Sequence, residues 1–175
     1  MKIVSLLRHA KSDWGDPALG DFDRPLNARG VKAARAMGRA LIRLGIGFDH
    51  VLASAAARVV GTIEGLAEEG IAIAPEYDRR IYLASPGTLL GLVRAADDAV
   101  GRLLVVGHNP GMAELALLLT RGGALREKVA AKYPTGALAE IRFDAQSWRD
   151  VAAGTGTLAR FIRPRDLAPD LGPED

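Results

Sequence analysis

The residues in this sequence that are best suited to chemistry are arginines and histidines at the ends of short apolar segments. With the polar residues beside them, they are Arg8, His9, Ser54, Arg58, His108 and Asn109. His9 and His108 each stand at the end of such a segment, whereas His50 stands at the start of one and is expected to be a solvated turn residue. Because strands end where polar residues begin, the position of either histidine alone needs no functional explanation. Their repetition favours a shared site instead.

Four cationic or protonatable side chains gathered at one place would be unfavourable without a bound anion. Like charges repel each other, and burial costs each charged group part of its hydration energy. A guanidinium group offers a planar fork of donors that matches phosphate oxygens. Arg8, His9, Arg58 and His108 therefore predict a site for a phosphoryl group.

The nucleophile at such a site can be inferred from the side chains that the sequence lacks. Cysteine is absent, no glycine-rich P-loop pattern occurs, and no acidic cluster has the spacing of metal ligands. A neutral imidazole can attack phosphorus, and water can then hydrolyse the resulting phosphohistidine. We therefore expect no metal and no cofactor, with one histidine attacking and the other donating a proton or a hydrogen bond.

Alternating apolar and amphipathic segments predict the elements that position these residues. Strands are expected at 2–7, 50–54, 71–74, 102–107, 137–143 and 157–163, and helices at 27–44, 55–69, 86–96 and 110–119. This alternation predicts an α/β fold, a three-layer α/β/α sandwich around a mostly parallel central sheet. Such sheets bind ligands beyond the carboxyl ends of their strands, where the arginines and histidines stand.

The chain shows no internal repeat and no linker, so residues 1–163 are expected to form one domain. Residues 12–26 are rich in Gly, Pro and Asp and are expected to be a loop. Residues 164–175 contain three prolines and four acids. That composition predicts a loosely ordered tail.

The overall charge and hydropathy exclude several classes of partner. A net charge of +2 is too small to argue for nucleic acid binding. No segment approaches the roughly 20 apolar residues of a membrane span, and no signal peptide is visible. We therefore expect a cytoplasmic protein. The helix at 27–44 carries four cations on one face, which is either a solvated surface or a docking surface for an acidic phosphoprotein.

Three motifs in order make the sequence resemble the histidine phosphatase superfamily. They are Arg8-His9 in "LLRHAKSDW", Ser54-Arg58-Thr62 in "SAAARVVGT", and Gly107-His108-Asn109 in "VVGHNPG". The resemblance implies a phosphoglycerate-mutase-like fold in which His9 is phosphorylated during turnover. It also implies that Arg8, Arg58, Ser54 and Asn109 bind the phosphoryl group, with His108 as the second catalytic histidine. The short chain and "DFDRPLNARG" look most like the SixA branch of phosphohistidine phosphatases.

Two departures from the family pattern bear on the substrate. Relatives that act on sugar phosphates carry an Asn after the Trp of the first motif, and this chain has Gly15 there. They also carry a Glu that protonates the leaving alcohol. The corresponding stretch, "YDRRIYLASPGT", offers only Asp78 and Tyr82 as substitutes.

A missing general acid favours one class of substrate. An alkoxide must be protonated as it leaves, whereas imidazole, with a pKa near roughly 6.5, can leave already protonated. Protein phosphohistidine is therefore the favoured substrate. The alternatives are a phosphatase of small phosphomonoesters with the same site, or a phosphate-binding interaction module without turnover.

Overall fold

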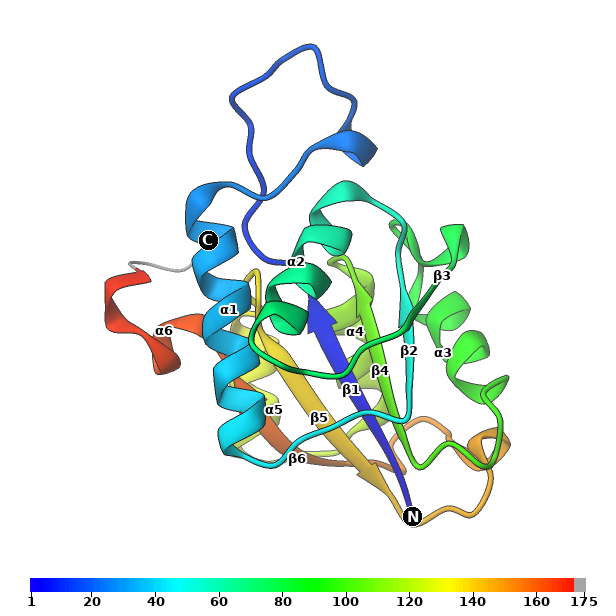
Figure 1. Ribbon diagram of the computed structural model, residues 1–175. Coiled ribbons are helices and arrows are strands. Elements are labelled where there is room, and N and C mark those ends of the chain that lie inside the picture. The colour runs from blue at the N-terminus through cyan, green and yellow to red at the C-terminus, as the bar shows by residue number, and fades with distance from the viewer. Residues whose placement is uncertain (172–175) are drawn as a thin grey trace.

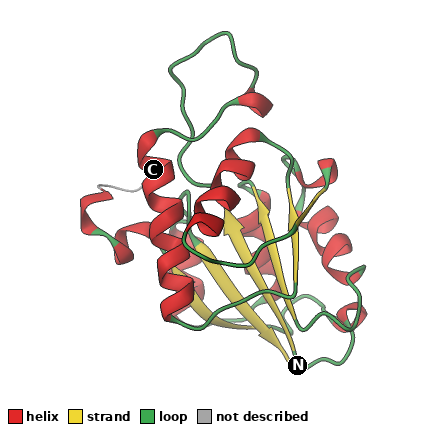
Figure 2. Ribbon diagram, in the orientation of Figure 1, coloured by secondary structure: helices red, strands yellow, loops and turns green. Residues whose placement is uncertain are grey.

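A six-stranded sheet forms the centre of the computed structural model, which describes residues 1–171 (Figures 1 and 2). The strands are β1 (Lys2–Arg8), β2 (His50–Ala53), β3 (Pro75–Tyr77), β4 (Arg102–Gly107), β5 (Leu138–Phe143) and β6 (Thr157–Ile162). Their order across the sheet is β3-β2-β4-β1-β5-β6. Strands β1 to β4 run parallel, β5 runs antiparallel to β1, and β6 runs antiparallel to β5. The expected α/β fold with a mostly parallel sheet is confirmed.

Helices cover both faces of this sheet. They are α1 (Ala28–Arg43), α2 (Ala57–Glu68), α3 (Pro86–Arg94), α4 (Gly111–Leu119), α5 (Ala124–Ala131) and α6 (Pro164–Leu167). Helices α1 and α2 share one apolar cluster with the sheet, through residues such as Met37 and Ile63. Helices α3, α4 and α5 share another with its opposite face, through Leu92, Met112 and Val129. The molecule thus has three layers, with apolar side chains filling both interfaces.

The cations on the exposed face of α1 are largely paired within the chain. Lys32 Nζ lies 2.8 Å from a carboxylate oxygen of Asp170. Arg35 and Arg39 lie 3.1 and 2.9 Å from Oε1 of Glu69. Exposed ion pairs of this kind change the free energy of unfolding little, and they form readily in water. These contacts therefore support the interpretation of this face as a solvated surface.

One strand lies later in the sequence than expected. The segment 71–74 was expected to be a strand, but the ladder with β2 begins only at Pro75, which pairs with Val51. Ile71 is instead buried against the core formed by α1 and α2. The apolar pattern of this segment therefore reflects side-chain burial rather than pairing.

The tail expected from residue 164 onward is not loosely ordered over its first eight residues. Pro164 begins α6, and residues 169–171 form a further helical turn. Leu171 is buried in a cluster with Ala33 and Ala36 of α1. Proline suits the first position of a helix because it needs no amide hydrogen there, so its presence did not exclude a helix. The last four residues of the expected tail, 172–175, lie outside the described residues.

Helix α5 was not expected from the sequence. It buries only Val129 fully, so its apolar pattern is too weak to mark it as an amphipathic helix. Throughout residues 1–171, no helix combines the length and the apolar character that crossing a membrane requires.

Candidate active site

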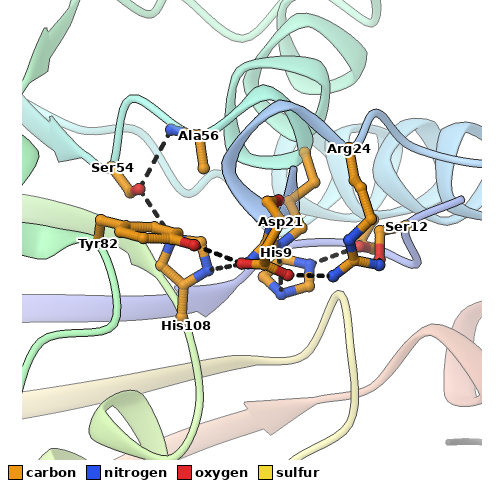
Figure 3. Close-up of polar contacts among 10 residues, drawn as sticks. His9, Ser12, Asp21, Arg24, Ser54, Ala56, Tyr82 and His108 are labelled. Atoms are coloured by element: carbon orange, nitrogen blue, oxygen red, sulfur yellow. Dashed lines mark hydrogen bonds and ion pairs between the residues drawn. The ribbon is translucent and has the colours of Figure 1, made fainter. Parts of the chain in front are cut away.

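The carboxyl ends of three neighbouring parallel strands place three polar residues together. His9 follows β1, Ser54 follows β2, and His108 follows β4. The amide of His9 donates to the carbonyl of Gly107, and that of Ser54 donates to the carbonyl of Val106, both at 3.0 Å. These bonds extend the sheet pairing by one residue and fix the polar residues relative to one another. The ring centroids of His9 and His108 lie 5.2 Å apart (Figure 3).

The hydrogen bonds of His9 define its tautomer. Nδ1 lies 2.7 Å from the carbonyl oxygen of Ala10, which can only accept, so Nδ1 carries the proton. Nε2 accepts from Nε of Arg58 at 3.3 Å. Burial lowers the pKa of His9 to about 3, and the charge of Arg58 adds to this effect, while the bond to Ala10 opposes it. The ring is therefore neutral at pH 7, with the lone pair of Nε2 facing a cation.

His108 is held in the other orientation. Nδ1 lies 3.3 Å from a terminal nitrogen of Arg58, which can only donate, so Nδ1 is the acceptor. Nε2 then donates to Oγ of Ser54 at 2.8 Å (Figure 3). Burial and the charge of Arg58 lower the pKa of His108 to about 4. Ser54 is fully buried, and its Oγ also accepts from the amide of Ala56.

Arg58 is the centre of this cluster. It is the second residue of α2, and its side chain is almost fully buried. A cation at the start of a helix meets the positive end of the helix dipole, which is unfavourable. Asp21 offsets this cost, because its carbonyl oxygen and its Oδ2 accept from Arg58 at 2.6 and 3.0 Å.

Thr62 connects the helix to the end of β1. Its hydroxyl donates to the carbonyl of Arg58 at 2.7 Å and accepts from the amide of Ala10 at 2.9 Å. One side chain therefore fixes the backbone on which both His9 and Arg58 depend.

Asp21 is the acidic group of the site, and its partners keep it ionised. The hydroxyl of Tyr82 donates to Oδ2, and Arg24 donates to Oδ1 (Figure 3). The bond from Tyr82, together with those from Arg24 and Arg58, holds the pKa of this carboxyl well below its usual range. The same bond to Asp21 raises the pKa of Tyr82. The Tyr82 ring also lies edge-on to His108, 5.3 Å between centroids.

Arg8 and Asn109 share a partner at the edge of the cluster. A terminal nitrogen of Arg8 and Nδ2 of Asn109 each donate to the carbonyl of Tyr133 at 2.9 Å. Oδ1 of Asn109 accepts from the amide of Ala113 in α4. The nitrogen and the oxygen of the Asn109 side chain are therefore both hydrogen-bonded to backbone groups.

A pocket opens beside the His9 side of the cluster, with a cavity volume of about 380 Å³. It is lined by Arg8, His9, Lys11, Ser12, Trp14, Arg24, Arg58 and Thr135. Four of these eight residues are cations. The pocket therefore fits an anionic ligand whose reacting atom approaches His9.

Of the two expected substitutes for a general acid, only one lies at the site. Asp78 accepts from the amide and the guanidinium of its neighbour Arg80 and lines a different cavity, beside His50 and Leu92. Tyr82 reaches Asp21 and His108, as described above.

The structure brings Arg8, His9, Ser54, Arg58 and His108 together, as the sequence predicted. It also adds residues from the 12–26 segment that the sequence analysis did not single out, namely Ser12, Trp14, Asp21 and Arg24. The spacing of Asp21 and Arg24 in "DFDR" was the one sequence feature that suggested a contact between these two residues. Nothing in its spacing showed that a loop would fold back onto α2.

The chain is similar to known proteins in sequence and in fold. The family model described as the histidine phosphatase superfamily (branch 1) matches residues 4–97, more than half of the chain. An uncharacterized protein of Mycobacterium tuberculosis is 38% identical over 163 residues, covering 91% of this chain and 100% of that protein.

Two solved structures match nearly the whole chain. A protein assigned as the phosphohistidine phosphatase SixA from Agrobacterium tumefaciens has a TM-score of 0.80 and 29% identity, over 93% of this chain and 98% of its own. A second protein with that assignment, from Nakamurella multipartitia, has a TM-score of 0.80 and 27% identity, over 93% of this chain and 96% of its own.

Proposed function

Because this chain belongs to the histidine phosphatase superfamily, we propose that it is a metal-independent phosphatase that works through a phosphohistidine intermediate on His9. Its favoured substrate is protein phosphohistidine, in the cytoplasm. The likeness to proteins assigned as phosphohistidine phosphatases supports this choice of substrate. The observation that carries the mechanism is the orientation of His9, whose Nδ1 contacts the carbonyl of Ala10 while Nε2 faces Arg58 beside a cationic pocket.

In the first step, Nε2 of His9 uses its lone pair to form a bond to phosphorus. The bond between phosphorus and the leaving nitrogen breaks, and its electron pair goes to the departing imidazole. The attacking ring gains positive charge, which the bond from Nδ1 to the carbonyl of Ala10 stabilises. Arg8 and Arg58 bind the equatorial oxygens of the transferring group, where charge accumulates.

In the second step, water attacks the phosphorus of phospho-His9. The bond to Nε2 breaks, its electron pair returns to the ring, which becomes neutral again, and inorganic phosphate leaves with the oxygen of the water and both of its protons. His108 keeps Arg58 in place through Nδ1, and Ser54 fixes the ring of His108 through Nε2. In this scheme Ser54 orients a catalytic residue rather than touching the substrate.

The protonation states around the cluster support phosphohistidine over a phosphate ester. Asp21 is ionised at neutral pH and has no proton to donate. The pKa of Tyr82 is raised, so its hydroxyl gives up its proton less readily. An alcohol leaving group would need such a proton, whereas imidazole, with a pKa near roughly 6.5, leaves protonated. The pocket beside His9 also opens next to the exposed Trp14, which leaves room for a side chain carried by another protein.

The test compares turnover of a phosphohistidine protein and of an aryl phosphate, in the presence of a chelator. The wild type should release phosphate from the phosphohistidine protein more efficiently, and His9→Ala should abolish release from both. His50→Ala is the matched control, because His50 lies at the opposite end of β2 and pairs with Glu76. It should retain wild-type turnover.

Three results would change the proposal. Turnover that survives in His9→Ala contradicts the mechanism. Preference for the aryl phosphate assigns the site to small phosphomonoesters. Phosphate binding without turnover of either substrate identifies an interaction module.

A further inference from the structure

The 12–26 segment forms a loop that projects beyond the carboxyl edge of the sheet and returns to it (Figure 1). Its two ends are joined by a bridge between Ser12 and Leu26 and by the bond from the amide of Asp13 to the carbonyl of Pro25. This closure places Arg24 in the pocket that His9 lines. Arg24 belongs to none of the three motifs at the strand ends.

Arg24 is buried and fixed, although it stands in a loop. Only 7% of the residue is exposed, and one terminal nitrogen donates to Oγ of Ser12 at 3.1 Å. The guanidinium carbon lies 3.3 Å from the ring centroid of Trp14, as expected for stacking. Within residues 1–171, its Nε is buried and has no hydrogen-bond partner. A buried donor without an acceptor is costly, so this nitrogen is available to a ligand in the pocket.

A single carboxylate joins Arg24 to the catalytic cluster. Asp21 accepts from Arg24 on Oδ1 and from Tyr82 on Oδ2 (Figure 3). Its Oδ2 also accepts from Arg58. Two guanidinium groups and a hydroxyl therefore converge on one small anion beside His9. A phosphoryl group presents the same kind of acceptor oxygens and carries more negative charge.

We propose that Arg24 is a further phosphoryl-binding residue and that the carboxylate of Asp21 occupies its guanidinium until the phosphoryl group replaces it. The phosphoryl dianion repels Asp21, so binding moves this carboxylate away and leaves Arg24 and Arg58 to the phosphoryl oxygens. The position of the phosphoryl group beside His9 rests on the proposed function. The loop thus adds a guanidinium fork to those supplied by Arg8 and Arg58.

The test is binding of inorganic phosphate, followed by calorimetry at neutral pH and low salt, to the wild type and three variants. Arg24→Met should weaken binding about tenfold or more, the effect of losing a charge-assisted hydrogen bond. Asp21→Asn should tighten binding on the order of fivefold, because the competing charge is removed. Arg43→Met makes the same change of charge at the far end of α1 and should bind like the wild type.

Unfolding measured on the same samples separates binding from folding. A merely structural role for Arg24 would lower the Tm of Arg24→Met and leave the phosphate affinity of the folded variant unchanged, which would overturn the proposal. If Arg24→Met does not fold, phosphate binding to Asp21→Asn tests the proposal instead. Phosphate affinity no higher than that of the wild type would then overturn the proposal.

Binding is measured without turnover, so the two proposals fail separately. Weaker binding in Arg24→Met and tighter binding in Asp21→Asn support the role of Arg24 even if the wild type hydrolyses no phosphohistidine. Hydrolysis by the wild type with unchanged phosphate affinity in both variants contradicts the role of Arg24 alone.

Discussion

The site is assembled from two regions that the chain holds in different ways. At the strand ends, His9 and Ser54 are fixed by backbone bonds that continue the pairing of β1, β4 and β2. In the 12–26 loop, Asp21 and Arg24 are fixed by side-chain contacts to Arg58, Tyr82 and Ser12. The strand ends are thus fixed by backbone bonds, whereas the loop residues are fixed by contacts that the proposed exchange of Asp21 for a phosphoryl group would break.

Arg58 joins the two regions, so its replacement should have the largest effect. We expect Arg58→Gln to lower kcat for phosphohistidine by about 10²–10³-fold, the loss found when a preorganised donor to developing charge is removed. Steady-state kinetics on the purified variant measures this, with Arg43→Gln as a control for charge at a remote position. A loss below about fivefold would show that the strand ends do not need this bridge.

Low pH should act on the strand ends through their histidines. The pKa values of His9 and His108 are lowered to about 3 and about 4, so both stay neutral in the fold while they protonate near 6.5 once unfolded. The unfolded state then binds more protons below pH 6.5, and the free energy of unfolding falls as the pH drops toward 4. Each histidine contributes a slope of up to about 1.4 kcal/mol per pH unit in this range.

Urea unfolding at pH 7 and pH 5 measures this slope. The double variant His9→Gln, His108→Gln should show a smaller loss of stability between the two values than the wild type. An equal loss in both proteins would contradict the assignment of neutral, buried rings to the strand ends.

A glycine in α1 tests how the loop is anchored. A Cβ at Gly30 would lie 2.1 Å from the carbonyl oxygen of Lys11, at the base of the loop. We expect Gly30→Ala to cost about 1–3 kcal/mol of stability, as overpacking does, and to lower phosphatase activity as the loop shifts. Gly91→Ala in α3 is the matched control, since a Cβ there meets no atom within 4 Å, and it should stabilise the fold by about 0.4–1 kcal/mol.

The smallest effect is expected at Tyr82, where the strand ends and the loop touch. Tyr82→Phe removes the hydroxyl that donates to Asp21 but keeps the ring beside His108. A hydrogen bond to a charged group is worth about 1.5–3 kcal/mol, but this one is made to Asp21 and not to the substrate, so kcat/KM should change less than about tenfold, and equally for phosphohistidine and aryl phosphate. A much larger loss on the substrate with the poorer leaving group would identify Tyr82 as a proton donor.

The two regions also differ in how far the sequence predicts them. His9, Ser54 and His108 follow buried strands, and parallel strands bring their carboxyl ends to one edge, so adjacency follows from local pattern and topology. Asp21 reaches the site through contacts across 37 residues of sequence to Arg58 and 61 to Tyr82, and Arg24 is held through Asp21 and Ser12. No local pattern specifies such contacts.

The same distinction explains the misplaced elements. The segment 71–74 has the apolar pattern of a strand, but Ile71 is buried in the core formed by α1 and α2, and the pairing with β2 begins only at Pro75. Residues 164–171 have the composition of a disordered tail, yet Leu171 is buried against α1. In both cases a tertiary contact decided the local structure, and composition alone does not record it.

The most direct test of the account is to trap the covalent intermediate. Enzyme mixed with phosphohistidine substrate is quenched in alkali during turnover, and the phosphorylated peptide is located by mass spectrometry. We expect one phosphoryl group on the peptide that contains His9, absent from His9→Ala and retained in His50→Ala. Phosphate on any other residue, or undiminished turnover with no labelled peptide, would contradict the assignment of His9 as the nucleophile.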